Sequence, residues 1–169
     1  VKTVGNSTTD KWYENDGRMT GYKETDPMGG YDPYSSSKGC SELLTRSYYN
    51  SFYKKKRKGL CTARAGNVIG GGDWSQDRLI PDILRTFSLK QNLLIRNKLA
   101  TRPWQHVLEP LSGYLNLAQN LFDNPSHFSG GYNFGPLEQD VKNVEWIVNK
   151  MSEYFPDSQW SEDQSDNPH

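Results

Sequence analysis

The sequence lacks the features that identify several large classes of protein. Its 169 residues include only two cysteines, with no CxxC pair and no clustered histidines. This argues against a disulfide-stapled fold and a structural zinc site, so no metal site is predicted, and it favours the reducing cytoplasm. The 20 basic and 20 acidic residues cancel, so no charge excess favours nucleic acid as a partner. No apolar run approaches the length of a membrane-spanning helix, and the first residues do not form a signal peptide, so no membrane partner is expected.

Hydrophobicity is also low. A mean hydropathy of −0.86 is unusual for a domain that must offset the entropy of folding by burying its own core. The 12% aromatic content argues against disorder. We therefore expect a folded piece whose core is completed by residues outside this chain.

A glycine-rich loop that would hold phosphate groups is missing as well. Residues 66–72 read GNVIGGG and follow a predicted strand, but they lack the GxGxxG spacing and no helix opens after them. No GK[ST] follows either, which excludes a Walker loop. The glycines predict an irregular turn in which the backbone passes close to another group.

Predicted strands and helices alternate along the chain. The expected strands cover residues 1–6, 59–66, 93–96 and 131–135, and the expected helices cover 34–54, 78–90, 107–122 and 144–155. The first strand is expected to be weak, because Gly5 and Ser7 disfavour it, and to run into a polar turn over residues 7–11. The basic run at 54–58 and Gly59 are expected to end the first helix. The alternation predicts an α/β fold.

Three of these helices repeat apolar residues at helical spacing. The repeats are Leu43, Leu44, Tyr48 and Phe52; Leu108, Leu111, Leu115, Ala118 and Phe122; and Val144, Ile147, Val148, Met151 and Phe155. The last repeat is the most regular and predicts an amphipathic helix.

The stretch YSSSK, residues 34–38, places Tyr34 and Lys38 on one face of a helix, one turn apart. Such a pair is either a solvated surface pair or half of a catalytic site. A phenol that accepts a proton near neutral pH needs its pKa lowered from ~10, a change of about 4 kcal/mol. An ammonium ~4 Å away, in an effective dielectric of ~20, supplies a raw attraction of similar size. The spacing is therefore typical of a base whose charge is stabilised by a neighbouring amine.

Several further segments accompany YSSSK. They are TTDKWYENDG, PMGGYDPYSSSKGC, ARAGNVIGGGDW, DRLIPDILR, RPWQHVLEPLSGY and YNFGP. In this order they resemble the extended short-chain dehydrogenase/reductases that act on nucleotide sugars, the NAD-dependent epimerases and dehydratases. The resemblance covers nearly the whole chain. The Asp10-Lys11 pair after Thr9 resembles the dehydratases, and the segments together resemble those that act on CDP-glucose.

The resemblance implies the C-terminal part of a Rossmann-like, doubly wound parallel sheet with a smaller substrate-binding subdomain. Residues 1–66 match the latter part of the NAD-binding domain. Residues 67–169 match mostly the nucleotide-sugar-binding subdomain, with a returning Rossmann strand and helix. The family's glycine-rich NAD site would precede this chain and the family continues past DNPH, so an internal fragment is expected. The helices beginning near Tyr34 and Val107 commonly pack on a partner subunit in this superfamily, which implies a homodimer of the full-length protein.

The same resemblance implies dehydration of CDP-D-glucose to CDP-4-keto-6-deoxy-D-glucose with NAD as a recycled cofactor, in deoxysugar and O-antigen synthesis. Tyr34 is then the base at the 4-hydroxyl while hydride passes to NAD, and Lys38 also holds the nicotinamide ribose. Thr9 hydrogen-bonds the oxygen on carbon 4, and Asp10 is the acid for the departing hydroxyl. Lys11 is either the base that takes the carbon 5 proton or an electrostatic anchor for the enolate.

The substrate-binding residues are implied in the same way. Asn67 and Arg102 resemble residues that contact the diphosphate, with Arg102 as a bidentate clamp. Taken alone, Asn67 reads as a turn cap and Arg102 as a surface charge. The other residues implied at the nucleotide are Arg78, Leu79, Ile95, Arg96 and Asn133. The tryptophans Trp74, Trp104 and Trp146 are expected in the core rather than against substrate.

Three functions stay open at this point. The first is the catalytic half of a nucleotide-sugar dehydratase. The second is a 4-epimerase or reductase on the same fold, against which Asp10 and Lys11 argue. The third is a non-catalytic remnant that binds a nucleotide sugar but cannot hold NAD. An upstream glycine-rich motif in the gene would favour the first, and the 169-residue chain alone is expected to be inactive.

Overall fold

The computed structural model describes residues 1–18 and 20–163. The main elements are β1 (Thr3–Thr9), α1 (Pro33–Tyr48), β2 (Gly59–Ala65), α2 (Leu79–Ser88), β4 (Asn92–Ile95), α3 (Leu108–Asp123), β7 (Gly130–Phe134), α5 (Val144–Ser152) and β9 (Gln159–Glu162). Short helical segments are η1 (Asp10–Trp12), η2 (Tyr49–Tyr53), η3 (Lys54–Lys56), α4 (Pro125–Phe128) and η4 (Glu138–Asp140). Two-residue strands are β3 (Val68–Ile69), β5 (Thr101–Arg102), β6 (Gln105–His106) and β8 (Lys142–Asn143). Residues 164–169 of the expected sugar-binding part lie outside the described residues.

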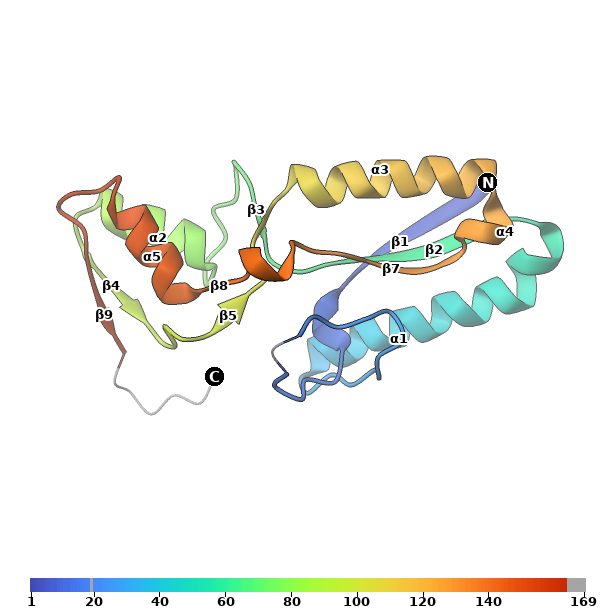
Figure 1. Cartoon of the computed structure of the whole chain (residues 1–169), viewed down its shortest axis with the longest axis horizontal. Helices are drawn as coiled ribbons and strands as arrows, with labels where there is room; N and C mark the ends of the chain where they lie inside the picture. The colour runs from blue at the N-terminus through green and yellow to red at the C-terminus, as the bar shows by residue number, and fades with distance from the viewer. Residues whose placement is uncertain (19, 164–169) are drawn as a thin grey trace.

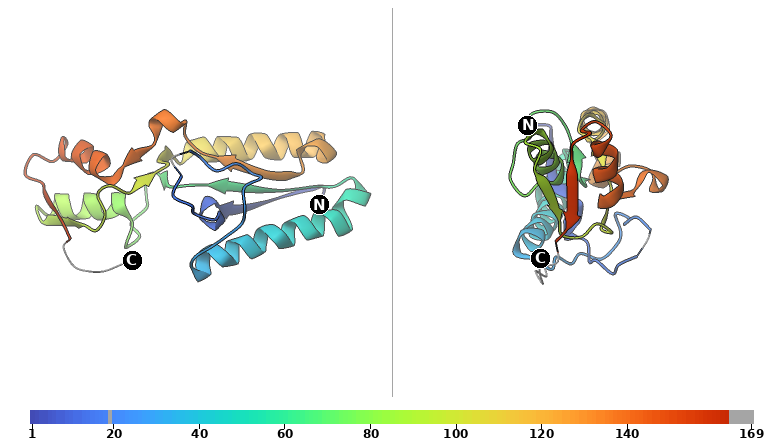
Figure 2. Two further views of the ribbon diagram at one scale, coloured as in Figure 1. Left: turned by 60° about the horizontal axis from the view of Figure 1, so that its bottom comes forward. Right: turned by 90° about the vertical axis from the view of Figure 1, so that its left-hand side faces the viewer.

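The molecule is elongated, with a parallel sheet at one end and β4 and β9 at the other (Figure 1). The sheet has the order β1-β2-β7, and β1 pairs with β2 in continuous register from Thr3↔Gly59 to Thr9↔Ala65. α1 and α3 cover its opposite faces (Figures 1 and 2). A parallel strand covered on both faces is buried along its length, as β2 is. This confirms the predicted α/β class with a parallel sheet.

The two faces of β2 carry different chemistry, because side chains alternate along a strand. Cys61 and Ala63 pack against leucines of α3 in an apolar core. Thr62 and Arg64 point to the other face, where both donate hydrogen bonds to Glu42 of α1. The α1 side of the sheet therefore contains a buried polar cluster.

The other end of the molecule has its own apolar core, called here the second core. Its buried members come from α2, β4 and α5: Ile83, Phe87, Leu93, Ile95, Ile147 and Val148. β4 and β9 pair in parallel beside it. Val144 and Met151 of α5 pack against this core, and so does Phe155, which lies beyond the end of α5. The amphipathic helix predicted for residues 144–155 is therefore confirmed up to Ser152.

The first strand is longer than predicted. β1 continues through Ser7, Thr8 and Thr9, for which the sequence predicts a turn. The ladder with β2 extends to the end of both strands, and the Thr8 hydroxyl donates to Glu42. Pairing with a buried neighbour thus outweighs the low strand propensity of Gly5 and Ser7.

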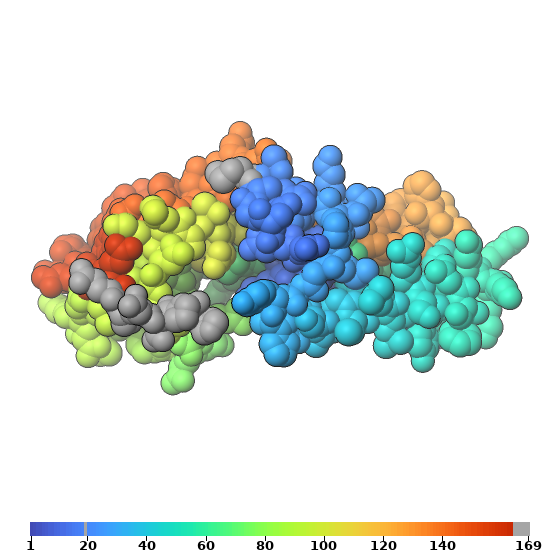
Figure 3. Space-filling view, turned by 90° about the horizontal axis from the view of Figure 1, so that it is seen from below, coloured from blue at the N-terminus to red at the C-terminus, as the bar shows by residue number. Residues whose placement is uncertain are grey.

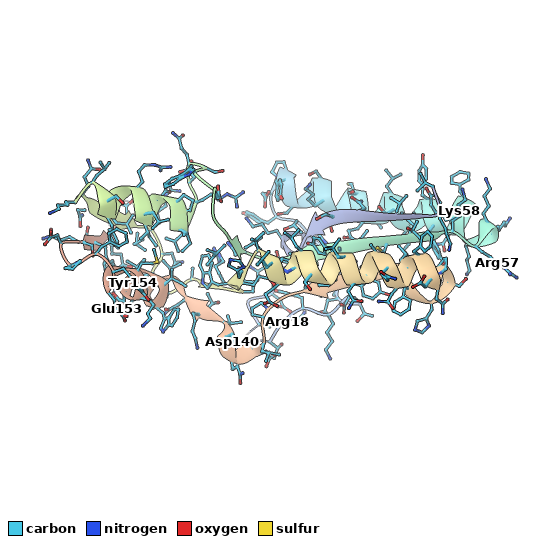
Figure 4. The ribbon with its side chains drawn as sticks, turned by 90° about the horizontal axis from the view of Figure 1, so that it is seen from above. Arg18, Arg57, Lys58, Asp140, Glu153 and Tyr154 are labelled. Atoms are coloured by element: carbon cyan, nitrogen blue, oxygen red, sulfur yellow. The ribbon has the colours of Figure 1, made fainter. Side chains whose placement is uncertain are left out.

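The helix that begins with α1 continues through η2, wound as a π-helix, and η3, wound as a 3₁₀ helix. Its extent agrees with the predicted end near residue 54. The helix ends inside the basic run at 54–58, as predicted, because the chain leaves it at Arg57, with φ 50°. Gly59, predicted as part of the stop, already belongs to β2. Arg57 and Lys58 form one tip of the molecule, far from Glu153 at the other end (Figure 4).

β9 has no counterpart among the predicted strands. Its residues do not alternate between apolar and polar, and of the four only Trp160 packs against the second core. The strand exists because it pairs with β4. The two-residue pairs β3–β6 and β5–β8 were also missed, since pairs this short leave no pattern in the sequence.

The apolar stripes of α1 and α3 face outward. The exposed side chains are Leu43, Leu44 and Tyr48 on α1, Phe52 on the following η2, and Leu108, Leu111, Leu115 and Phe122 on α3. Because the two helices cover opposite faces of the sheet (Figure 2), these stripes do not form one continuous surface. Packing of the two helices on a partner subunit stays a prediction.

Two of the three tryptophans expected in the core are exposed instead. Trp74 is 65% exposed and Trp146 is 47% exposed. Trp74 lies in the irregular turn after β3, and Trp146 lies on the outer side of α5. Trp104 does pack against the second core, and its indole N–H donates to the Lys142 carbonyl at 3.1 Å.

The described part of the chain contains neither a membrane-spanning helix nor a cluster of metal ligands. No helix there is long and apolar enough to cross a membrane. Within residues 1–18 and 20–163, no group of three His, Cys, Asp or Glu side chains could hold a metal ion. Cys40 is exposed and Cys61 is buried, and both are free thiols.

Candidate functional site

A cleft of about 1430 Å³ lies between the carboxyl ends of the sheet strands and the second core. Its walls come from the end of β1 and η1, the start of α1, the turn after β2, the start of α2 and the segment after β4. Ligands of open α/β sheets bind at this edge. Seen from below, the N-terminal segment in blue and the segments in green and yellow lie on either side of the hollow (Figure 3).

Most predicted site residues meet at this cleft. Its lining includes Thr9, Asp10, Lys11, Tyr34, Asn67, Arg78, Leu79, Ile95, Arg96 and Arg102. Lys38 and Asn133 are not part of the lining. The fold thus brings together residues that lie on separate segments of the sequence.

The end of β1 sets the direction of Asp10. Parallel pairing places Thr9 beside Ala65, so Asp10 and Gly66 leave the sheet together. Thr9 is buried, and its hydroxyl accepts from the Lys11 amide at 3.4 Å and donates to Oδ1 of Asp10 at 3.4 Å. A threonine in this position caps the following helical turn, η1, and satisfies an amide without a helical partner.

The carboxyl group of Asp10 is enclosed. Burial raises the pKa of Asp10 above its ordinary value. Hydrogen bonds from its own backbone amide and Thr9, and the charges of Lys11 and Arg102, oppose this shift without cancelling it. A Cβ atom on Gly66 would lie 2.7 Å from Oδ2 of Asp10. A buried carboxyl that keeps its proton to higher pH suits a general acid.

Tyr34 and Lys38 stand one turn apart at the start of α1, as predicted. Asp32 caps this helix, accepting from the Ser35 amide at 3.0 Å and from its hydroxyl at 2.6 Å, and Pro33 occupies the first helical position. Nζ of Lys38 lies 5.5 Å from the centroid of the Tyr34 ring. The two side chains share one face of the helix, and the tyrosine lines the cleft.

Lys11 also lines the cleft, but its side chain is exposed. A lysine that acts as a base must lose its proton, and burial is the usual cause of that loss. An exposed ammonium can also stabilise a negative charge that develops in the cleft, so both roles of Lys11 stay predictions.

Three arginines line the cleft. Arg78 precedes α2, Arg96 follows β4 and Arg102 ends β5, and all three are exposed. Nη2 of Arg96 lies 3.7 Å from Oδ1 of Asp77, and Nη1 of Arg102 donates to the Thr101 carbonyl at 2.9 Å. Guanidinium groups of this kind can bind the oxygens of a diphosphate in pairs.

The other cleft residues predicted to contact the nucleotide also pack or form hydrogen bonds within the fold. Ile95 is 4% exposed and belongs to the second core, so it offers the cleft little surface. Leu79 is half-buried and packs against the same core. The backbone carbonyl of Asn67, and not its side chain, accepts a hydrogen bond from the Gln105 amide at 3.1 Å.

Asn133 is not at the cleft, contrary to the prediction. Its Oδ1 accepts from the Tyr13 hydroxyl at 2.8 Å, and its Nδ2 donates to the Tyr22 carbonyl at 2.9 Å. Asn133 is the register partner of Arg64, so both side chains point to the α1 face of the sheet. The face that a short strand presents is decided by the assembled sheet, which explains the error.

Trp74 and Tyr114 line the cleft without having been predicted there. Tyr114 packs edge-on against Phe134 with ring centroids 5.0 Å apart. Trp74 closes the segment GGGDW. An exposed aromatic residue beside a run of glycines is the signal that could have indicated a position facing a ligand.

Similarity to known proteins agrees with this arrangement. The NAD dependent epimerase/dehydratase family matches residues 1–131. The chain belongs to that family. A CDP-glucose 4,6-dehydratase from Salmonella typhimurium is 53% identical over 175 aligned residues, covering 100% of this chain and 49% of the relative. The chain therefore spans about half the length of this curated relative, and the predicted resemblance is confirmed.

Solved structures share the fold. A dTDP-glucose 4,6-dehydratase from Bacillus anthracis, in complex with NAD, matches with a TM-score of 0.75 and 20% identity over 97% of this chain and 50% of that chain. A UDP-N-acetylglucosamine 4-epimerase from Methanobrevibacter ruminantium matches with a TM-score of 0.77 and 16% identity over 99% of this chain and 52% of that chain. The two enzymes are named for different reactions, so the likeness establishes the Rossmann-like fold and not the chemistry.

Proposed function

We propose that the chain is the catalytic and sugar-nucleotide-binding part of an NAD-dependent dehydratase that converts CDP-D-glucose to CDP-4-keto-6-deoxy-D-glucose. The observation that carries the proposal is the meeting of Tyr34, paired with Lys38, and a buried Asp10 of raised pKa around one cleft. The 53% identity to a CDP-glucose 4,6-dehydratase supports the choice of substrate. Residues 1–66, with α3 and β7, belong to the cofactor domain, and most of the remaining chain forms the sugar-nucleotide subdomain.

Tyr34 removes the proton of the 4-hydroxyl. The ammonium of Lys38, 5.5 Å from the phenol ring, stabilises the negative charge that the phenol needs for this role. NAD, when bound, would supply the acceptor for the carbon 4 hydride and the source of the hydride for carbon 6. The Lys38 ammonium is also a hydrogen-bond donor suited to ribose hydroxyls. Residues 1–18 and 20–163 contain no glycine-rich loop that opens a helix, so we assign the pyrophosphate of NAD to another part of the full-length protein.

Asp10 is the acid of the elimination. The ketone at carbon 4 makes the carbon 5 proton acidic, and we propose that water in the open cleft accepts this proton. Asp10 gives its own proton to the 6-hydroxyl, which leaves as water, and the carbon 5 proton is regained when hydride returns to carbon 6. Thr9 hydrogen-bonds the oxygen on carbon 4, and Lys11 stabilises the enolate charge. Tyr34 ends with one extra proton and Asp10 with one fewer, and solvent exchange restores both.

The diphosphate of the substrate binds the arginines. Arg102 is the clamp, and Arg78 and Arg96 complete a cationic wall of exposed guanidinium groups around the same cleft. Asn67 contributes an amide beside them. Charge-assisted bonds from arginine to phosphate are bidentate and strong, which suits a substrate held mainly by its diphosphate.

We also propose a homodimer of the full-length protein, formed through the outer face of α1. Its exposed stripe consists of Leu43, Leu44 and Tyr48 and continues onto Phe52 of η2. Apolar stripes of this kind on a helix commonly mark a protein interface. The two free thiols of the chain fit a reducing compartment, the cytoplasm.

The test is turnover of CDP-, dTDP-, UDP- and GDP-glucose by the full-length protein. We expect a 4-keto-6-deoxy product from CDP-glucose, and Tyr34→Phe is the matched control that should abolish it. A product inverted at carbon 4 would favour the epimerase, and binding of CDP-glucose without turnover would favour the non-catalytic remnant. The 169-residue chain alone should give no product, and clear activity of that chain would contradict the proposed division of the NAD site.

A further inference from the structure

A buried ion pair connects α1 with β2. Arg64 and Glu42 are each 6% exposed. Nε of Arg64 donates to Oε1 of Glu42 at 3.0 Å, and Nη2 donates to Oε2 at 2.8 Å. Thr62 donates to Oε2 at 2.7 Å, and Thr8 donates to Oε1. Both carboxylate oxygens are thus fully used, as a buried ion pair requires.

The pair is held in its charged form. Burial acts to raise the pKa of Glu42, but the hydrogen bonds from Arg64, Thr8 and Thr62 outweigh it and hold the pKa below its ordinary value. The two parallel N–H···O bonds of the guanidinium also fix the orientation of the carboxylate. The pair is therefore a rigid joint between the helix and the sheet.

The same guanidinium contacts the turn that carries Asp10. Its Cζ lies 4.5 Å from the ring of Trp12, the last residue of η1, and its Nη1 donates to the Tyr13 hydroxyl at 2.8 Å. Nε1 of Trp12 is buried and has no hydrogen-bond partner within the described part of the chain. Stacking on Arg64 and on Tyr13, whose ring centroid is 4.2 Å away, therefore holds the Trp12 ring.

The Glu42 end of the pair lies on the helix of the proposed base. Glu42 stands one helical turn beyond Lys38 and two turns beyond Tyr34. Through Thr8 it holds the strand just before Asp10, and through Arg64 it holds the residues just after Asp10. The segment that carries the acid is thus fastened on both sides to the helix that carries the base.

We propose that the Glu42–Arg64 pair is a positioning device that fixes Asp10 relative to Tyr34. This rests on the proposed function, because it requires both groups to act on one sugar. When the pair is weakened, Tyr34 stays on a regular helix, whereas Asp10 sits in a three-residue turn held by stacking. The acid therefore loses its position first, and elimination at carbon 6 slows more than oxidation at carbon 4.

The test uses Glu42→Gln in the full-length protein, because this change keeps the size of the side chain and removes its charge. We expect kcat to fall on the order of 100-fold, as for a misplaced catalytic group. KM for CDP-glucose should stay nearly unchanged. Reduced nicotinamide should accumulate in a single turnover, because the oxidised sugar waits for elimination. Arg64→Lys should behave in the same way.

The matched control is Glu153→Gln, which removes the carboxylate of an exposed pair with Lys150 at 2.7 Å. Glu153 lies at the end of the molecule far from the sheet (Figure 4), and wild-type kinetics are expected. If circular dichroism shows that Glu42→Gln does not fold, Thr8→Val and Tyr13→Phe replace it. Thr8→Val removes the bond to Glu42, and Tyr13→Phe removes the bonds to Arg64 and Asn133. They should show a smaller loss with the same accumulation of reduced nicotinamide.

Equal slowing of oxidation and elimination in the folded variants would overturn the positioning role, and so would wild-type rates. If the unmodified full-length protein failed to dehydrate CDP-glucose, the proposed function itself would fall. The two failures are therefore distinguishable in one series of measurements.

Discussion

Gly66 and Asp10 occupy a space in which a methyl group has no room. A Cβ atom on Gly66 would lie 2.7 Å from Oδ2 of Asp10 and 2.6 Å from Cγ of Pro103. Both distances are well inside ordinary van der Waals contact. The position of the proposed acid therefore depends on the absence of a side chain at Gly66, the first residue after β2.

We predict that Gly66→Ala displaces the Asp10 carboxyl group. Dehydration by the full-length protein should slow on the order of 100-fold, and overpacking should cost about 1–3 kcal/mol of unfolding free energy. Steady-state kinetics and urea denaturation measure the two effects. Gly135→Ala is the control, since no atom lies within 4 Å of an added Cβ there. Wild-type rates in Gly66→Ala would show that Asp10 tolerates the shift.

Asp10→Asn should change how stability depends on pH. Burial raises the pKa of Asp10, so its protonated form is favoured by folding, and this contribution is lost as pH rises through the folded-state pKa. The asparagine variant carries no such charge. It should melt at a higher temperature than the wild type near neutral pH, and the difference should vanish below about pH 4, near the pKa of an unfolded aspartate.

Calorimetry across this pH range measures the effect. A wild type that gains stability relative to Asp10→Asn as pH rises would contradict the direction of the pKa shift. Activity gives an independent check, because the variant cannot donate a proton to the leaving hydroxyl.

Substitutions can separate the two roles predicted for Lys11, the stabilisation of the enolate charge and the base at carbon 5. If it stabilises the enolate through its charge, Lys11→Arg should keep activity within about tenfold, while Lys11→Gln should lose on the order of 100-fold or more. Initial rates of the full-length protein with CDP-glucose measure both. Equal inactivity of the two variants would instead assign Lys11 as the base at carbon 5.

The two cysteines should differ in reactivity. Burial raises the pKa of the Cys61 thiol to about 11, whereas Cys40 is exposed on α1. In the Leu44→Glu variant of the full-length protein, whose α1 face should be free of a partner, iodoacetamide at about pH 8 should modify Cys40 and spare Cys61, because only the accessible thiolate reacts. Peptide mass spectrometry resolves the two sites, and unfolding in urea is the control that should make both reactive. Equal labelling in the folded protein would disprove the burial of Cys61.

The outer face of α1 should control assembly. Leu44 is 59% exposed within the apolar stripe of this helix, and Leu44→Glu should convert the full-length dimer to a monomer. Leu99, 68% exposed and distant from α1 in the sequence, provides the control Leu99→Glu. Light scattering measures the mass of each variant, and a dimer that survives Leu44→Glu would exclude this face as the interface.

Local features of the fold were predictable. The spacing of Val144, Ile147 and Val148 predicted a helix that packs on a core, and α5 does so. The helix predicted to begin at Tyr34 begins one residue earlier, at Pro33, and its first turns align Tyr34 with Lys38. Helical periodicity is a property of neighbouring residues, which is why a sequence reveals it.

Features that depend on pairing were not predictable. β9 is a strand only because β4 lies beside it, and β1 extends to Thr9 because β2 continues the ladder. Asn133 points away from the cleft because its strand joined the sheet in the register of Arg64. A strand has no intrinsic face, so its orientation is set by partners far away in the chain.

The sequence by itself determined the alternation of strands and helices and the one-turn spacing of Tyr34 and Lys38, because both follow from residues close together in the chain. Only the tertiary structure decided the burial of Asp10 and the ion pair between Glu42 and Arg64. The physical reason is that desolvation and ion pairing depend on which distant segments exclude water from a group, and those segments meet only when the chain has folded.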